Sequence, residues 1–331
     1  MTVSRSLNNA PGVGEKMKAE VLKAADQLGY HLNPLVAANM SNIRSRRKGN
    51  YTATLAVLCS RPKDQSWPSI DSRIEGALAR SEELGFGCDV FDLADDKFTP
   101  ANLDRIIKNR GIRGLIVTPI EMDLSQCHLD YSRLSVILCF PGSQPQTFPR
   151  VIPDHYGNMD QLLRKLGERG YRKIGLMVSE ELDLQTAQYW QSKYFSYCQS
   201  NSLDPIPPYM PSLDSNYSVD TFRDWFGQHL PEVLITTCER IFESRFFERS
   251  GLPIPKDVAV VKVNINCMDR NVSGITEASA EVGRVAVEIL SQHMYNNSYG
   301  LQNNPFTVLV PGQWTDRGAL AREGVRFQPI A

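Results

Sequence analysis

The residue types that most often carry catalysis or bind metals are present in this chain, but their spacing fits neither role. The five histidines are widely separated, and no two of the seven cysteines form a C-x-x-C motif. Neither a metal site nor a disulfide framework is therefore predicted. The sequence also lacks G-x-S-x-G, Walker and H-E-x-x-H motifs. We expect no enzymatic activity, no metal and no cofactor.

Positive charge concentrates at the N-terminus, and this is the clearest chemical pattern. Residues 1–48 contain eight Lys and Arg against three Asp and Glu, whereas the whole chain of 331 residues holds 36 basic and 37 acidic residues. The run at 44–48 would neutralise nucleic-acid phosphates whatever the base sequence. A solvated linker is the alternative interpretation of this run.

The overall composition is that of a globular protein, with 42% hydrophobic and 22% charged residues. No apolar run approaches the roughly 18 residues needed to span a bilayer, so no membrane partner is expected. The first residues lack the apolar stretch of a secretory signal. We therefore expect a cytoplasmic location with reduced cysteines.

Two kinds of element follow one another along the chain. Short helices are predicted at 3–7 and about 15–28, ahead of a domain boundary near Gly49. Beyond it, apolar strands alternate with amphipathic helices, which indicates two successive α/β lobes with parallel, doubly wound sheets. The predicted strands are 54–59, 88–93, 114–118, 135–140, 173–178, 233–236, 258–263 and 305–310. The predicted helices are 69–84, 100–108, 159–169, 184–200, 219–228, 239–251 and 279–295.

Sequence motifs accompany this order of elements from end to end. They are TVSRSLN at 2–8, VLKAA at 21–25, LGY at 28–30 before Asn33-Pro34, GIRGLI at 111–116, GYRKIG at 170–175, PKDVAVV at 255–261, and Gly283. Together they resemble the lactose-repressor (LacI/GalR) family of bacterial transcription regulators over nearly the whole chain. The resemblance implies a small all-α DNA-binding segment, followed by two doubly wound parallel-sheet lobes of periplasmic-binding-protein type.

The resemblance also implies the domain organisation. Residues 1–49 would form a partial helix-turn-helix head and a hinge helix, and residues 50–331 an effector-binding domain. In that domain we expect a first lobe at about 50–153 and 277–305, and a second at about 154–276 and 306–316. We expect hinges where 151–155 carries the chain between the lobes and where 263–265 carries it back. Periodicity alone leaves helix 279–295 and strand 305–310 open to either lobe.

A recognition helix reads the major groove with residues near its N-terminal end, where short donors and Arg reach base edges and phosphates. The resemblance implies that the DNA contacts are Thr2, Ser4, Arg5, Asn8, Asn33, Asn39, Met40 and Arg44. Taken alone, residues 2–5 also fit any capped surface helix. Asn39 stands where the family inserts an apolar Leu into the minor groove, so either Met40 takes that role or the operator is bent less.

The chain begins inside the family's recognition helix, so about 16 residues of the usual helix-turn-helix are missing. We expect weak operator binding, or none, from these 331 residues. A start codon assigned too late is the favoured explanation, ahead of a shortened chain or a true loss of the reading head.

The family's two lobes close on a small molecule, usually a sugar, at the carboxyl ends of their strands. Matching motifs imply that the effector contacts are Trp67, Asp71, Thr118, Phe140, Tyr217, Thr237, Asn264 and Glu277. Aromatic rings stack on sugars, while carboxylates and amides bond hydroxyls, so we expect a mono- or oligosaccharide. The alternatives are core packing for the aromatic residues and solvation for the acids. Gln185 and Gln188 stand where many relatives hold an Arg, so the effector could differ from a simple hexose.

These features together predict a transcription regulator that binds operator DNA as a homodimer, with its DNA affinity controlled by the effector. The alternative is a sugar-binding protein of periplasmic type without DNA-binding activity. Such a protein would carry a secretory signal in place of the basic head.

Overall fold

The computed structural model describes residues 3, 6, 14–27, 53–60, 68–95, 97–120, 124–141, 147–211, 218–237, 258–265, 272–318 and 320. The chain separates into two compact units, Met1–Thr52 and Ala53–Ala331. In the first unit, helix α2 (Glu15–Gln27) confirms the helix expected at about 15–28. The eight predicted DNA contacts lie outside the described residues: Thr2, Ser4, Arg5, Asn8, Asn33, Asn39, Met40 and Arg44.

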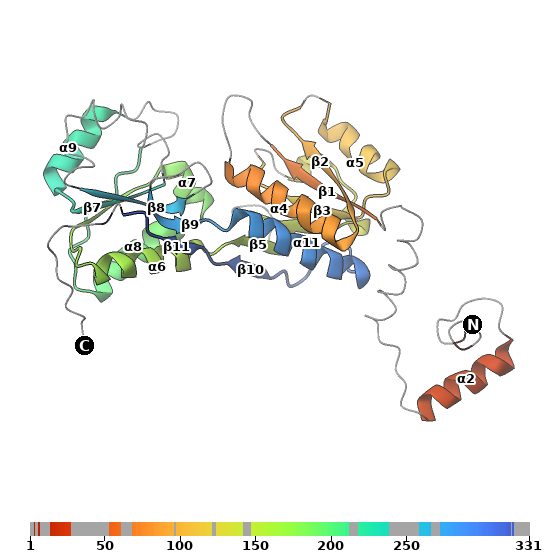
Figure 1. Ribbon diagram of the computed structural model, residues 1–331. Coiled ribbons are helices and arrows are strands. Elements are labelled where there is room, and N and C mark those ends of the chain that lie inside the picture. Colours follow the sequence, from red (N-terminus) through yellow and green to blue (C-terminus); the bar gives the residue numbers. More distant parts are fainter. Residues whose placement is uncertain are drawn as a thin grey trace. The chain divides into compact units, whose positions relative to one another are not determined.

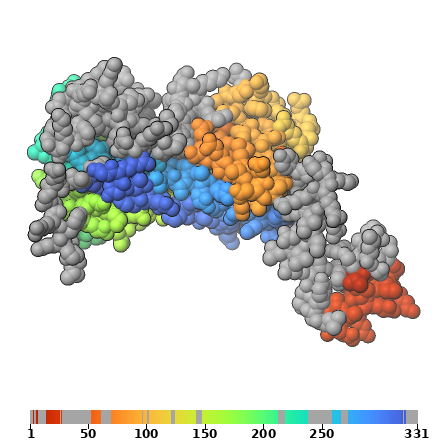
Figure 2. Space-filling model, viewed as in Figure 1, coloured from red at the N-terminus to blue at the C-terminus, as the bar shows by residue number. Residues whose placement is uncertain are grey.

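The second unit contains a six-stranded parallel sheet with the order β10-β5-β4-β3-β1-β2. Its strands are β1 (Thr54–Cys59), β2 (Gly87–Asp92), β3 (Gly114–Val117), β4 (Ser135–Leu138), β5 (Arg150–Pro153) and β10 (Thr307–Val310). One face packs against α4 (Pro68–Leu84) and α11 (Ser279–Tyr295), which lie side by side (Figures 1 and 2). The other packs against α5 (Pro100–Asn109) and the 3₁₀ turn Leu124–Cys127. Burial on both faces explains the continuous apolar strands.

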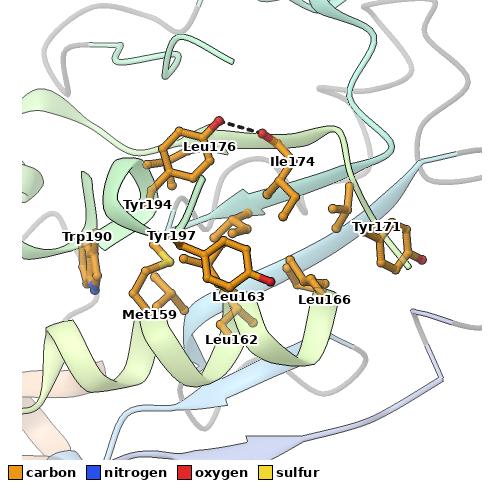
Figure 3. Close-up of a cluster of buried hydrophobic side chains, with 14 of the residues drawn as sticks. Met159, Leu162, Leu163, Leu166, Tyr171, Ile174, Leu176, Trp190, Tyr194 and Tyr197 are labelled. Carbon is orange, nitrogen blue, oxygen red and sulfur yellow. Dashed lines mark hydrogen bonds between the residues drawn. The ribbon is translucent and has the colours of Figure 1, made fainter. Parts of the chain in front are cut away.

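A second sheet follows, with the order β11-β9-β8-β7-β6. Its strands are β6 (Ile174–Met177), β7 (Val233–Thr236), β8 (Ala259–Ile265), β9 (Ser273–Thr276) and the antiparallel β11 (Gln313–Thr315). Figure 3 shows its main core, where α6 (His155–Glu168) packs against α8 (Tyr189–Ser200). There the Tyr194 hydroxyl donates to the Ile174 carbonyl at 2.9 Å. Helix α9 (Val219–His229) lies on the other face.

Most predicted elements agree with the structure, and helix 184–200 is the main exception. It is two helices, α7 (Glu180–Gln185) and α8, because Ala187 and Gln188 adopt positive φ angles of 55° and 58°. A right-handed helix cannot continue through such residues. The predicted helix 239–251 lies outside the described residues.

Two predicted lobe assignments are wrong. Residues 306–316 were expected in the second lobe, but β10 pairs with β5 along its length in the first sheet, and only β11 lies in the second sheet as expected. The return at 263–265 is also wrong, since these residues belong to β8 and Ile265 still pairs with Thr276 of β9. The chain instead crosses back at Glu277 and Ala278, between β9 and α11.

Three crossings therefore connect the two sheets: Asp154, then residues 277 and 278, then residues 311 and 312. Hydrogen bonds tie them to one another. The Asp154 N–H donates to the Val310 carbonyl at 2.9 Å, and the Gly312 N–H donates to Asn158 Oδ1 at 2.8 Å. Glycine is required at 312, because a Cβ there would collide with the Thr276 carbonyl. The crossings form one packed group.

Candidate functional site

The carboxyl ends of the strands in the two sheets face each other. Strand β5 ends at Pro153 and α6 of the second lobe begins at His155, while β9 ends at Thr276 and α11 begins at Ser279. Because these connections are so short, the carboxyl edge of each sheet must lie towards the other lobe. Figure 1 shows α11 running from the end of β9 into the first lobe. Ligands of open α/β sheets bind at such edges.

In the first lobe, predicted effector contacts at this edge already bond to or pack against other residues of the same lobe. Thr118 follows β3, and both its N–H and its Oγ1 donate to the Leu58 carbonyl at the end of β1, at 2.9 and 3.0 Å. Phe140 follows β4 and packs against the apolar cluster under α5. Asp71 lies half-buried in the first turn of α4. Trp67 lies outside the described residues.

Glu277, a predicted contact, is held by an arginine that sequence reasoning missed. The guanidinium Nη2 of Arg73 lies 3.3 Å from Glu277 Oε1, with side-chain exposures of 8% and 9%. The Ser279 hydroxyl donates to Glu277 Oε2 at 3.0 Å. Arg73 stands in the buried stripe of α4 beside Ile70 and Ile74, and a cation in an apolar stripe was the signal that could have identified it.

His155 lies beside this ion pair and adds no charge to it at neutral pH. Its ring is 5% exposed and contacts the Trp190 ring edge-on, with centroids 5.2 Å apart. Burial lowers the pKa of His155 to about 4, against a smaller opposing effect of the Glu277 carboxylate. The neutral imidazole is thus the form present above about pH 5.

The second lobe presents buried polar atoms that have no hydrogen-bond partner in the described part of the chain. Thr237 follows β7 and Asn264 stands near the end of β8, and because β7 and β8 are adjacent parallel strands, both residues lie at the carboxyl edge of the second sheet. Thr237 Oγ1 and Asn264 Oδ1 are buried and have no hydrogen-bond partner among the described residues. Each such atom costs about 1–3 kcal/mol. Tyr217 lies outside the described residues.

Two further polar groups at this edge were missed from the sequence. Asp183, in α7 after β6, is fully buried; its Oδ2 accepts from Gln191 Nε2 at 3.3 Å, while its Oδ1 has no partner in the described part of the chain. Burial raises the pKa of the Asp183 carboxyl. Trp190 Nε1, in the first turn of α8, is likewise buried and unbonded there. No local motif marks either residue, because each is buried through packing between helices.

Two classes of site find no support in the described residues. No group of three or more His, Cys, Asp or Glu is arranged there to hold a metal ion. None of the helices described is long and apolar enough to cross a membrane.

Comparison with family models matches both ends of the chain. The model "Bacterial regulatory proteins, lacI family" matches residues 1–33, and the model "Periplasmic binding protein-like domain" matches residues 163–320. Among curated relatives, the HTH-type transcriptional regulator TreR of Salmonella typhimurium is 23% identical over 62% of this chain, and 61% of that relative is covered. The NTD biosynthesis operon regulator NtdR of Bacillus subtilis is 28% identical over 78% of this chain and 77% of its own length.

Solved structures show the same fold. A transcriptional regulator CelR–cellobiose complex matches with a TM-score of 0.65, at 17% identity, over 96% of this chain and 95% of that one. The lac repressor dimer bound to operator and the anti-inducer ONPF matches with a TM-score of 0.60, at 16% identity, over 97% and 95%. The trehalose repressor from Escherichia coli matches with a TM-score of 0.58, at 16% identity, over 80% and 99%.

These matches confirm the predicted fold class, two α/β lobes of periplasmic-binding-protein type behind an N-terminal DNA-binding segment. The curated relatives are named as transcriptional regulators, in agreement with the expectation that the chain is not an enzyme. These matches confirm the resemblance to the lacI family of bacterial regulatory proteins that the sequence motifs indicate.

Proposed function

We propose that this protein regulates transcription by binding operator DNA as a homodimer, and that a carbohydrate effector bound between the facing carboxyl edges of the two lobes controls its DNA affinity. One observation carries the effector site: Thr237, Asn264, Asp183 and Trp190, on elements at or after the carboxyl ends of second-sheet strands, each have a buried polar atom without a partner among the described residues. Native folds leave few such atoms, and each calls for an explanation. A polar ligand that bonds to these atoms would be such an explanation.

The chemistry of these atoms supports a polyhydroxylated ligand. The open oxygens of Thr237, Asn264 and Asp183 can accept hydrogen bonds, and sugar hydroxyls are donors. In the first lobe, Phe140 offers an apolar ring at the end of β4. Two of the structural neighbours carry a carbohydrate in their names, cellobiose in one and trehalose in the other. Of the eight effector contacts expected from the sequence, seven remain part of this proposal, whereas Thr118, already bonded to the Leu58 carbonyl, is assigned to the stability of the first lobe.

The DNA-binding half of the proposal rests on the N-terminal segment. The lacI-family model matches residues 1–33, and the excess of positive charge lies in the first 48 residues. Operator half-sites related by two-fold symmetry call for a dimer, and one structural neighbour is a repressor dimer on its operator. The contacts at Thr2, Ser4, Arg5, Asn8, Asn33, Asn39, Met40 and Arg44 remain predictions. So does the cytoplasmic location that operator binding requires.

Thermal unfolding against a sugar panel tests the effector site. Trehalose, cellobiose, maltose and glucose are each added to the full chain, and we expect at least one to raise the melting temperature in proportion to log concentration. The shift should vanish in Asn264→Ala and persist in Thr307→Val, a matched change on the exposed strand β10. Failure of all four sugars, with cellobiose and trehalose at millimolar concentration, would contradict the carbohydrate assignment.

Selection of genomic DNA fragments followed by fluorescence anisotropy tests the regulator assignment. The chain is measured as it stands and with any in-frame upstream codons added. We expect sequence-selective binding that weakens with salt and changes when the stabilising sugar is added. Sugar binding without any DNA binding in either form would favour the alternative, a sugar-binding protein. Sedimentation of the DNA-bound form checks the two-to-one stoichiometry.

A further inference from the structure

The Arg73–Glu277 ion pair joins a helix of one lobe to the sheet of the other. Arg73 belongs to α4, which packs on the first sheet through Ile70 and Ile74. Glu277 directly follows β9 of the second sheet, and its N–H donates to the Ile265 carbonyl at the end of β8, at 3.0 Å. The guanidinium and the carboxylate thus meet across the boundary between the lobes, 3.3 Å apart.

The arginine end of this pair cannot shift within its own lobe. Helices α4 and α11 approach so closely that a Cβ on Gly283 would collide with the Arg73 carbonyl, and a Cβ on Gly76 would collide with the Ala280 carbonyl. The two helices are therefore packed too closely to shift past one another, and Figure 2 shows their surfaces in contact. A change in the angle between the lobes that carries Glu277 with the second sheet, to which its N–H is bonded, would therefore move Glu277 away from Arg73.

The surroundings of the pair make separation costly. Both side chains are more than nine-tenths buried. Among the described residues, Glu277 supplies the carboxylate that pairs with Arg73. His155 cannot replace either partner, since it lies neutral against Trp190. A buried charge that loses its partner is strongly destabilising, so the arrangement in which the two charges meet is favoured over others.

We propose that Arg73 and Glu277 form an inter-lobe clamp, a pair of positioning residues that sets the angle between the two sheets. The other crossings are held by hydrogen bonds from the N–H groups of Asp154 and Gly312. The clamp adds a charged contact between the crossing at Glu277 and α4, which belongs to the body of the first lobe. A ligand that favours another lobe angle must work against this ion pair.

Amide hydrogen exchange on the full chain, without any ligand, tests the clamp. In Arg73→Met and in Glu277→Gln we expect exchange to rise about tenfold or more in peptides covering 150–158 and 273–280. Peptides covering 54–59 and 114–117, in the first sheet's centre, should exchange as in the wild type. The double variant should rise no further than the larger single variant, because both changes break one contact.

Small-angle X-ray scattering supplies a readout that a merely local structural role would not move. Both single variants should change the scattering profile in the same way, because both release the same angle. The matched control is Arg284→Met, which breaks the Arg284–Glu83 ion pair between α11 and α4 inside the first lobe, 2.9 Å long. That variant should leave the crossing peptides and the profile unchanged.

Several outcomes would overturn the clamp. Unchanged exchange at the crossings in both folded variants would do so, and so would an effect of Arg73→Met that Glu277→Gln does not share. If either variant fails to fold, Arg73→Lys and Glu277→Asp keep the charges but change the reach, and they should give smaller increases at the same peptides. No change there would equally reject the proposal. None of these measurements involves the effector, so a failure of the clamp and a failure of the proposed function can be told apart.

Discussion

The carboxyl edges of the two lobes differ in how their polar side chains are satisfied. In the first lobe, Thr118 bonds the end of β1 and Arg73 holds Glu277. In the second lobe, Thr237 and Asn264 have buried oxygens without partners among the described residues. A polar residue after a strand is therefore not a ligand contact by its position alone. Side chains already bonded by the fold stabilise it, and those left unbonded are suited to a ligand.

The largest effect should come from removing one end of the inter-lobe ion pair. Glu277→Leu leaves the buried Arg73 guanidinium unpaired, so we expect a loss of about 3–5 kcal/mol in the free energy of unfolding, measured by urea denaturation. Adding Arg73→Met should restore most of this loss, since an apolar pair then fills the space. If Glu277→Leu alone were as stable as the wild type, the Arg73–Glu277 ion pair would not stabilise this edge of the first lobe.

Acidification should weaken the boundary between the lobes through His155. Its folded pKa of about 4 lies below the ordinary value of 6.5, so the unfolded chain binds the proton first and stability falls as pH drops from about 6.5 to 4. At pH 5 the loss should reach about 2 kcal/mol. Denaturation of His155→Gln beside the wild type at pH 7.5 and 5 checks this. An equal pH dependence in both proteins would rule out the contribution.

In the second lobe, Asn264→Ala should reduce sugar affinity about tenfold or more while changing the free energy of unfolding by less than about 1 kcal/mol, because Oδ1 has no partner to lose among the described residues. Calorimetric titration with the sugar that stabilises the wild type most gives the affinity. If Asn264→Ala bound the sugar as well as the wild type, or lost stability instead, Asn264 would not be a ligand contact. The proposed difference between the two edges would then be wrong.

Thr118→Val should show the opposite behaviour and the smallest effect. The lost hydrogen bond to the Leu58 carbonyl should cost about 1 kcal/mol of stability, with sugar affinity unchanged. Denaturation and titration of this variant alongside Asn264→Ala measure both quantities. A clear loss of affinity in Thr118→Val would instead make Thr118 a ligand contact, as the family resemblance implied.

Most of the fold could be predicted because it follows from local periodicity. Helix 279–295 and strand 233–236, for instance, coincide with the observed α11 and β7. Strand β9 has the sequence Ser-Gly-Ile-Thr, too short and too polar to show a pattern. The break before α8 falls on Ala187 and Gln188, residue types that give no turn signal. The place of β10 depends on pairing with β5, which no local pattern encodes.

The candidate site was less predictable, for a related reason. Thr237, Asn264 and Glu277 could be proposed because motifs shared with the family implied them, and the first two also follow predicted strands. The partners that decide what each does lie far away in sequence: Arg73 is 204 residues from Glu277. Asp183 was missed because helix packing, and no motif, buries it. Strand ends can be read from a sequence, whereas the hydrogen bonds that satisfy them need coordinates.

The interleaved order of the strands has a consequence for synthesis on the ribosome. When the first five strands of the first sheet have emerged, α11 and β10, which cover one face and one edge, have yet to be translated. Val57, Ile74 and Ile137, which α11 later covers, therefore stay uncovered until the whole second lobe has been made. Such uncovered apolar surface is prone to aggregate. The first lobe therefore matures only near the end of translation, and a fragment ending after β5 should not accumulate as a stable protein.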